Sequence, residues 1–138
     1  MMAIEVRGLT PLVQVYDMPA SVRFYRDLLG FEIVSTSPVL GKDRFHWVLL
    51  RLGKAELMLN TAYEFDHERP VPADRVRAAT HEDITLYFGC PDVDAAYEEL
   101  HEKGVALRPP QAAPYGMKQL SLRDPDGYGL CFQWPADE

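Results

Sequence analysis

The sequence predicts an α+β fold in which two tandem β-α-β-β-β modules form a curved mixed sheet around a cleft. The first observation is a repeat: a strand-like segment from Thr10 to Asp17 and another from Thr85 to Asp92 each lead into a helical stretch. The offset is 75 residues in both pairs, 85 − 10 and 92 − 17. Self-similarity at one offset indicates a repeated structural unit. The second observation is that strand-like hairpin patterns follow each helical stretch, which completes the module.

The first module is expected to cover residues 8–60. Alternating β-forming residues predict a strand over 9–16, after which Asp17 can cap a helix that has Pro19 in its first turn. Gly30 can end this helix in the left-handed conformation. The remaining elements are a helix face of Val22, Tyr25 and Leu29, a strand over 31–35, and hairpin strands over 45–52 and 55–60 that a turn at 53–54 joins.

The second module is expected to cover residues 83–135, after a polar linker over 61–82. A strand over 84–90 precedes Asp92, which can cap a helix that ends at Gly104. The remaining elements are a helix face of Val93, Ala96, Tyr97 and Leu100, a short strand over 105–107, and hairpin strands over 118–123 and 129–134 around the turn Asp124-Pro-Asp-Gly127.

The composition indicates a single domain over residues 1–138. Hydrophobic residues are 47% of the chain and charged residues 25%, which is an ordinary balance for a globular protein. The formal net charge of −7 argues against a nucleic-acid partner, because phosphate binding needs clustered Lys and Arg. The same charge could attract cationic small molecules or could serve solubility alone.

Two further observations bear on location. No run of about 18 apolar residues is present, and the first residues lack the pattern of a signal peptide, so we expect a cytoplasmic protein without membrane contact. Cys90 and Cys131 both lie in apolar strand-like runs. We expect them to be buried free thiols, which suits a reducing compartment.

Alternation along the predicted strands separates two faces of each sheet. Val13 and Val15 share a face that suits packing on the helix, whereas Gln14 takes the opposite face. The opposite face mixes apolar walls with a few polar groups, as a ligand cavity does. The candidate ligand-binding residues there are Gln14, Trp47, Met58, Asn60, Tyr87 and Gln119, with Tyr115 in a loop beside the last hairpin and Arg51 as either a ligand contact or a solvated strand end.

Three motifs resemble the vicinal oxygen chelate superfamily, which includes glyoxalase I, bleomycin resistance proteins, fosfomycin resistance enzymes and extradiol dioxygenases. They lie in residues 15–31, 92–105 and 122–127, and the resemblance extends from about Leu9 to Trp134. It implies the glyoxalase/bleomycin resistance fold and usually a homodimer whose subunits share two concave sites. It also implies a substrate-contacting side chain at Gln14 and an aromatic residue at the cavity rim, where Tyr115 stands.

The resemblance further implies where a metal would bind. Enzymes of the superfamily use a His or Gln at the start of each module's first strand and a Glu in its last strand. In this sequence these positions are Thr10 and Met58 in the first module and Thr85 and Cys131 in the second. Such donors do not suit a divalent cation, which prefers carboxylate, imidazole or thiolate ligands. We therefore expect no metal and no other cofactor.

The leading interpretation is a metal-free binding protein that sequesters a hydrophobic or aromatic, and conceivably cationic, small molecule such as an antibiotic. The aromatic residues Trp47, Tyr87 and Tyr115 could stack on a planar ligand or could fill the cleft as core. One alternative is a metal-dependent lyase, isomerase or dioxygenase with relocated ligands. Another is a pseudo-enzyme that makes protein contacts. The candidates for relocated ligands are His81, Glu56 and Cys131, while His46, His67 and His101 occupy less suitable places.

Overall fold

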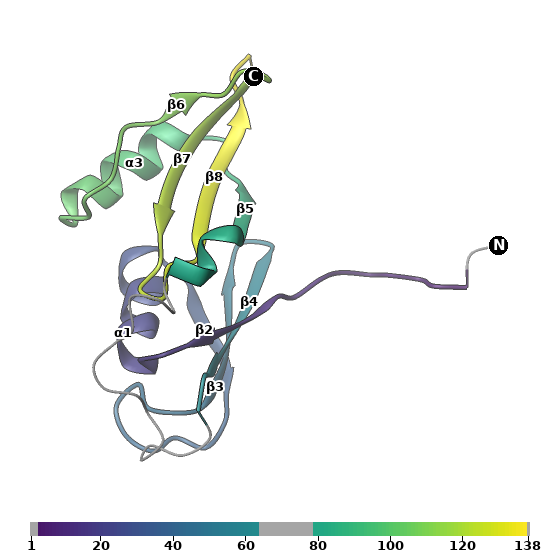
Figure 1. Cartoon of the computed structure of the whole chain (residues 1–138), viewed down its shortest axis with the longest axis vertical. Coiled ribbons are helices and arrows are strands. Elements are labelled where there is room, and N and C mark those ends of the chain that lie inside the picture. Colours follow the sequence, from purple (N-terminus) through teal and green to yellow (C-terminus); the bar gives the residue numbers. More distant parts are fainter. Residues whose placement is uncertain (1–2, 64–78, 138) are drawn as a thin grey trace. The chain divides into compact units, whose positions relative to one another are not determined.

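The computed structural model describes residues 3–63 and 79–137. Its contacts divide the chain into two compact units, Met1–Pro70 and Val71–Glu138. In the described residues, each unit contains a four-stranded mixed sheet and a helix that follows its first strand (Figure 1). The predicted α+β architecture of two β-α-β-β-β modules is therefore confirmed, with a separate sheet in each module. No helix in the described ranges is long and apolar enough to cross a membrane.

The first module begins with an edge strand that pairs with the last strand of the same module. The strands are ordered β1-β4-β3-β2, with β1 parallel to β4 and the other neighbours antiparallel. In chain order the elements are β1 (Leu12–Val15), α1 (Met18–Val22), η1 (Arg23–Leu28), β2 (Glu32–Thr36), β3 (Trp47–Leu52) and β4 (Ala55–Thr61).

The core of this module lies between the sheet and the helix, as the alternation predicts. Val13 and Val15 on β1 are buried, whereas the residues between and before them are exposed. The strand register places the other buried residues of β3 and β4 on the same face of the sheet. They are Val48 and Leu50 on β3 and Leu57, Leu59 and Thr61 on β4.

The helix starts as predicted but changes its hydrogen bonding after Val22. Asp17 Oδ1 accepts a hydrogen bond from the Ala20 amide at 3.1 Å, which caps the first turn. From Arg23 to Leu28 the helix is a π-helix, and the Leu29 amide donates to the Phe24 carbonyl five residues earlier. The spacing of apolar residues does not predict such a widened turn, because the turn shifts the helix face by only one residue.

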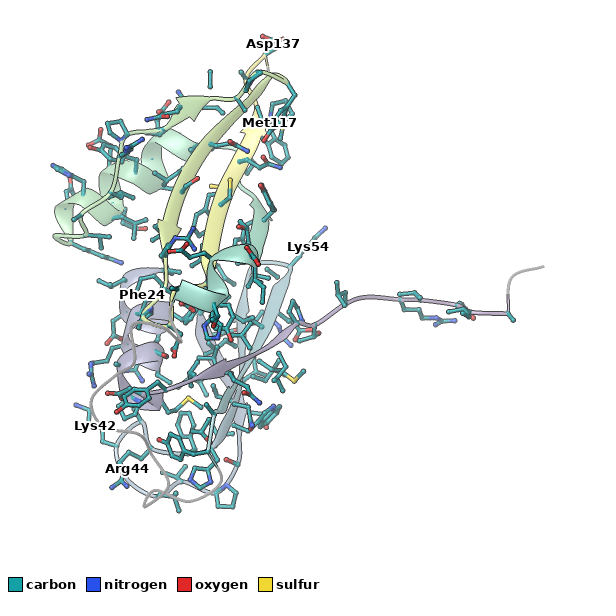
Figure 2. The ribbon with its side chains drawn as sticks, viewed as in Figure 1. Phe24, Lys42, Arg44, Lys54, Met117 and Asp137 are labelled. Carbon is teal, nitrogen blue, oxygen red and sulfur yellow. The ribbon has the colours of Figure 1, made fainter. Side chains whose placement is uncertain are left out.

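The loop between β2 and β3 is attached to this helix by an ion pair. Arg26 donates from Nη1 and Nη2 to the two carboxylate oxygens of Asp43, at 2.8 and 2.9 Å. Asp43 has a φ of 54°, in the left-handed region that Asp and Asn tolerate better than most residues. Figure 2 shows the neighbouring Lys42 and Arg44 on the same loop. Hydrogen bonding to Arg26 holds the pKa of Asp43 below its ordinary value.

Replacing Asp43 with Asn is expected to lower the free energy of unfolding by about 1 kcal/mol at pH 7, because Asn tolerates the backbone but cannot form the ion pair. Since the pKa of Asp43 is lowered on folding, the ion pair contributes fully above the ordinary carboxyl pKa of about 4. That contribution disappears as the pH falls through the lowered pKa. Urea unfolding of both proteins from pH 7 to pH 2.5 should therefore show a difference that shrinks with acid. A difference that does not depend on pH would contradict the assignment.

The second module repeats the arrangement. Its strands are ordered β5-β8-β7-β6, with β5 parallel to β8. Figure 1 shows α3 beside this sheet, and its buried residues Val93 and Leu100 belong to the predicted helix face. In chain order the elements are η3 (His81–Asp83), β5 (Thr85–Gly89), α3 (Val93–Glu102), β6 (Gln111–Ala112), β7 (Met117–Arg123) and β8 (Gly129–Pro135).

The predicted strand over 105–107 is wrong. The Val105 amide donates to the Leu100 carbonyl at 3.0 Å, and Gly104 has a φ of 84°, so these residues complete the C-cap of α3. The strand at this edge of the sheet is β6, which begins after Pro110 and pairs with β7. Proline has no amide hydrogen to donate to a ladder, so the pairing follows the two prolines instead of preceding them.

Two smaller expectations need revision. Thr61, expected in the linker, is the last residue of β4. Residues 64–78 of the predicted linker, including His67, lie outside the described residues. Cys131 is buried as expected, but Cys90 is only half-buried, because the edge strand β5 leaves it near solvent.

Candidate functional site

The strand register brings four of the predicted ligand-binding residues together on the first module. Gln14 on β1 pairs with Asn60 on β4, and Asn60 pairs with Trp47 on β3. These three residues therefore form one row across the sheet. Met58 lies in the adjacent row, between Leu12 and Leu49. Because all of them alternate with the buried core residues, they share the face that points away from the helix.

The second module has two matching rows. Tyr87 pairs with Cys131 and Cys131 with Ser121, in the place that Leu12, Met58 and Leu49 occupy in the first module. Gly89 pairs with Gln133 and Gln133 with Gln119. The register thus confirms that Met58 and Cys131 occupy equivalent positions in the two modules.

Side-chain hydrogen bonds connect the row of Gly89, Gln133 and Gln119 to the loop before β7. Gln119 Nε2 donates to the Tyr115 hydroxyl at 2.7 Å and to Gln133 Oε1 at 2.9 Å. The structure therefore joins two predicted site residues, Gln119 and Tyr115, directly, and it adds Gln133, which was not predicted from the sequence. Its parity with Cys131 and its place opposite Gln119 are the signals that could have identified it.

A hollow of about 320 Å³ lies on this face of the second module. Tyr87 and Gln119 line it, and the buried Cys131 is part of its wall. Ser121 and Arg123 also line the hollow, and they share the parity of Gln119, although they were not among the residues predicted from the sequence. The full set of lining residues is Thr85, Tyr87, Gln119, Ser121, Leu122, Arg123, Gly129, Leu130 and Cys131.

One end of the hollow depends on a glycine. The Gly129 amide donates to the Ile84 carbonyl at 2.9 Å, which brings the first and last strands of the module together. A Cβ atom at position 129 would stand 2.7 Å from Thr85 Oγ1 and 3.3 Å from the Ile84 carbonyl oxygen. A larger residue at position 129 would therefore force the Thr85 side chain to move from its place against β8.

The donors at the positions that correspond to metal ligands do not fit a divalent metal. They are the hydroxyls of Thr10 and Thr85, the thioether of Met58 and the thiol of Cys131. Burial raises the pKa of Cys131, so the thiol stays protonated near neutral pH instead of supplying a thiolate. Among the residues that the structure describes, no three His, Cys, Asp or Glu side chains gather closely enough to hold a metal ion.

His81, the candidate for a relocated ligand, is instead bound to the last turn of its module. Its Nδ1 donates to the Asp126 carbonyl at 2.7 Å, and its ring stacks on Tyr128 with the centroids 4.1 Å apart. His101 is exposed and stacks on Tyr97. Both contacts explain the placement of these histidines without a metal.

Arg51, the uncertain candidate of the first module, is paired with carboxylates. Its Nη2 lies 3.1 Å from Glu56 Oε2 and its Nη1 lies 4.0 Å from Glu32 Oε1. Both partners stand beside it in the sheet register. The charge of Arg51 is therefore largely balanced within the module.

A second hollow, of about 200 Å³, lies at the start of α1 in the first module. None of the predicted ligand-binding residues lines it. Its walls come from the helix start, the loop before β3 and the end of β4, and they are Met18, Pro19, Leu40, Arg44, Phe45, His46, Thr61 and Tyr63. The mixed face of the second module is therefore the better candidate site, since it combines a hollow with predicted residues.

Comparison with known proteins gives a consistent picture. The sequence model of the Glyoxalase/Bleomycin resistance protein/Dioxygenase superfamily matches residues 9–132. The uncharacterized protein YraH of Bacillus subtilis (strain 168) is 26% identical over 114 residues, which are 81% of this chain and 85% of YraH.

Two solved structures are similar over nearly their whole length. TnmS3, an antibiotic binding protein from Streptomyces sp. CB03234, has a TM-score of 0.67 and 26% identity, and the match covers 98% of this chain and 99% of TnmS3. A bleomycin resistance determinant encoded on the transposon Tn5 has a TM-score of 0.66 and 20% identity, and the match covers 94% and 98% of the two chains. At 20% identity the second likeness shows the shared fold.

Proposed function

Because the chain belongs to the glyoxalase/bleomycin resistance protein/dioxygenase superfamily, we propose that it is a metal-free binding protein that sequesters a hydrophobic or aromatic small molecule. The observation that carries this proposal is the hollow of about 320 Å³ on the second module. Its volume lies at the lower end of the range of small-molecule pockets. Its walls include Thr85 and Cys131, which stand at the positions that the resemblance implies for metal ligands, and these two side chains offer a hydroxyl and a protonated thiol. Such a site can bind a compound and has no evident means to convert it.

Exposed aromatic side chains support a ligand with a planar ring. Tyr87 is 60% exposed and Tyr115 is 67% exposed, although both lie on or beside the mixed face of the second module. Neither ring is part of the core of its own module. Large exposed rings beside a hollow are suited to stack on a ligand, and their hydroxyl groups can still contact water.

The similar structures support the same class of ligand. TnmS3 is described as an antibiotic binding protein, and it matches this chain over nearly all of both lengths. We extend that activity to this chain as a proposal: the compound is an antibiotic with an aromatic portion, and protection results from stoichiometric capture.

The proposal predicts that planar aromatic antibiotics raise the melting temperature of the protein, because a ligand that binds only the folded state stabilises it. The Tyr87→Ala variant is expected to bind such a compound about 5- to 10-fold more weakly, since one stacking contact contributes about 1 kcal/mol. Isothermal titration calorimetry measures this change. Glu98→Ala, on the exposed side of α3, is the matched control and should bind like the unchanged protein.

Two results would contradict this function. One is a screen of aromatic antibiotics in which no compound changes the melting temperature. The other is one tightly held divalent ion per chain in the purified protein, with an activity that chelation removes. That second result would favour the metal-dependent enzyme with relocated ligands.

We also propose that a second copy of the chain is its protein partner. Residues 3–9 are exposed and extend away from the sheet of the first module (Figure 1). Ile4, Val6 and Leu9 in this segment are 80%, 72% and 87% exposed. Ile4 and Val6 alternate with Glu5 and Arg7, which form an ion pair at 2.8 Å. An alternating extended segment is suited to pair with a strand, and its exposed apolar side chains gain free energy when a partner covers them.

Light scattering after size exclusion tests the homodimer. The full chain is expected at twice the mass of 15.7 kDa, and a variant without residues 2–9 is expected to be mostly monomeric. An Ile4→Ser, Val6→Ser variant provides a milder form of the same test, because it keeps the backbone and removes only the apolar surface. If the full chain is monomeric at about 50 µM, the proposal is contradicted.

A further inference from the structure

Arg123 is the charged residue among those that line the hollow of the second module. It is the last residue of β7 and lies opposite Gly129, on the same face as Gln119 and Ser121. Its Nη1 donates to the Gly127 carbonyl at 2.7 Å, which attaches one end of the guanidinium to the turn. A guanidinium has five N–H donors, so several remain for another partner.

The ion pairs found among the described residues do not include Arg123. The next residue, Asp124, does not serve as its partner. Asp124 is buried, and its Oδ1 accepts hydrogen bonds from the amides of Asp126 and Tyr128, both at 2.9 Å. The positive charge of Arg123 is therefore not balanced by a carboxylate in the part of the chain that the structure describes.

The first module provides a natural comparison. Arg51 follows Leu49 by two residues as Arg123 follows Ser121, and Leu49 and Ser121 pair with the equivalent Met58 and Cys131. Arg51 is paired with Glu56 and Glu32. In the second module the position opposite Arg123 is Gly129 instead of a glutamate. The same strand position thus carries a neutralised cation in one module and an available cation in the other.

The groups around Arg123 are uncharged hydrogen-bonding groups. Thr85 and Ser121 supply hydroxyls, Gln119 supplies an amide, and Tyr87 supplies a phenol, and all four line the same hollow. No Asp or Glu is among the lining residues that the structure describes. Hydroxyl groups beside a guanidinium can donate hydrogen bonds to the oxygens of an anion.

From this arrangement, and on the basis of the binding function proposed above, we infer that the ligand is an aromatic carboxylic acid whose carboxylate is bound by Arg123, Thr85 and Ser121. Its ring then lies toward Tyr87. This differs from the cationic ligand that a net charge of −7 could attract. Remote surface charges are screened over about 8 Å at physiological ionic strength, whereas a group in contact with Arg123 is not.

A matched pair of probes tests the inference: 2-naphthoate and its uncharged amide, 2-naphthamide. Heteronuclear NMR titration measures both affinities. We expect naphthoate to shift the amide resonances of Thr85, Ser121 and Arg123 and to bind about 10-fold more tightly than naphthamide, since a charge-assisted hydrogen bond contributes more than a neutral one. Raising the salt concentration should weaken only naphthoate.

Arg123→Gln should reduce naphthoate affinity about 10-fold and leave naphthamide affinity unchanged, so that the two probes become equivalent. Arg51→Gln is the control, because it removes the equivalent arginine of the other module, and it should change neither affinity. Equal affinities in the unchanged protein, or no effect of Arg123→Gln, would overturn the carboxylate assignment while the binding function stands. The inference is also overturned if neither probe binds at about 10 mM, which is the limit of weak binding. The screen of antibiotics then tests the binding function separately.

Discussion

Replacing Tyr25 with alanine is expected to lower the free energy of unfolding by about 3–5 kcal/mol, the range for removing a large aromatic side chain from a core. Tyr25 lies in the π-helical segment and is completely buried. Its ring makes edge contacts with Phe24 and Phe31, at centroid distances of 5.1 and 5.6 Å. Alanine would remove these contacts and leave a cavity beneath the helix. Urea unfolding monitored by circular dichroism measures the change.

Phe24→Ala is the matched control for Tyr25→Ala. Phe24 is the adjacent aromatic residue of the same segment, but it is only half-buried. Its loss should therefore cost clearly less, because less apolar surface returns to water. Equal costs for the two variants would show that the π-helical segment does not hold Tyr25 in the core as described.

Replacing Asp124 with alanine is expected to cost about 2–4 kcal/mol, since it leaves two buried backbone donors without an acceptor. Asp124 Oδ1 accepts from the amides of Asp126 and Tyr128, and all three residues are buried. The turn also carries the carbonyl that binds His81 and the carbonyl that binds Arg123. Thermal unfolding should show the loss, and ligand binding at the adjacent hollow should weaken with it.

Asp124→Asn separates the acceptor from the charge. The Asn side-chain oxygen can accept the same two hydrogen bonds, so this variant should lose clearly less stability than Asp124→Ala. Pro125→Ala serves as a control within the turn, because Pro125 is exposed and donates no hydrogen bond. An Asp124→Ala protein as stable as Pro125→Ala would contradict the role of this carboxylate.

The two-module fold could be predicted from the sequence because its signals are local. Asp17 and Asp92 cap helices in the structure, and each lies immediately before the helix that it caps. Buried residues alternate with exposed ones along β1 and with half-buried ones along most of β4, since side chains of a strand alternate between two faces. The strand over 105–107 was the main error. A capping hydrogen bond from Val105 to Leu100 competed with strand pairing, and propensity does not reveal such competition.

The candidate site was predictable only in part. Parity placed Gln14, Met58 and Asn60 on one face of the first sheet, and the register confirms that they share it. Arg123 and Gln133 were missed because parity alone does not show which polar side chain has a partner. Arg51 and Arg123 look alike in the sequence, and only their neighbours in the sheet distinguish them.

The sequence by itself therefore determined the repeated module, its helix caps and the two faces of each strand. These follow from residue type and from spacing along the chain. Only the tertiary structure decided which strands are neighbours, and hence that Arg123 faces a glycine where Arg51 faces a glutamate. The charge and the shape of the hollow result from contacts between residues far apart in the chain, which no local pattern specifies.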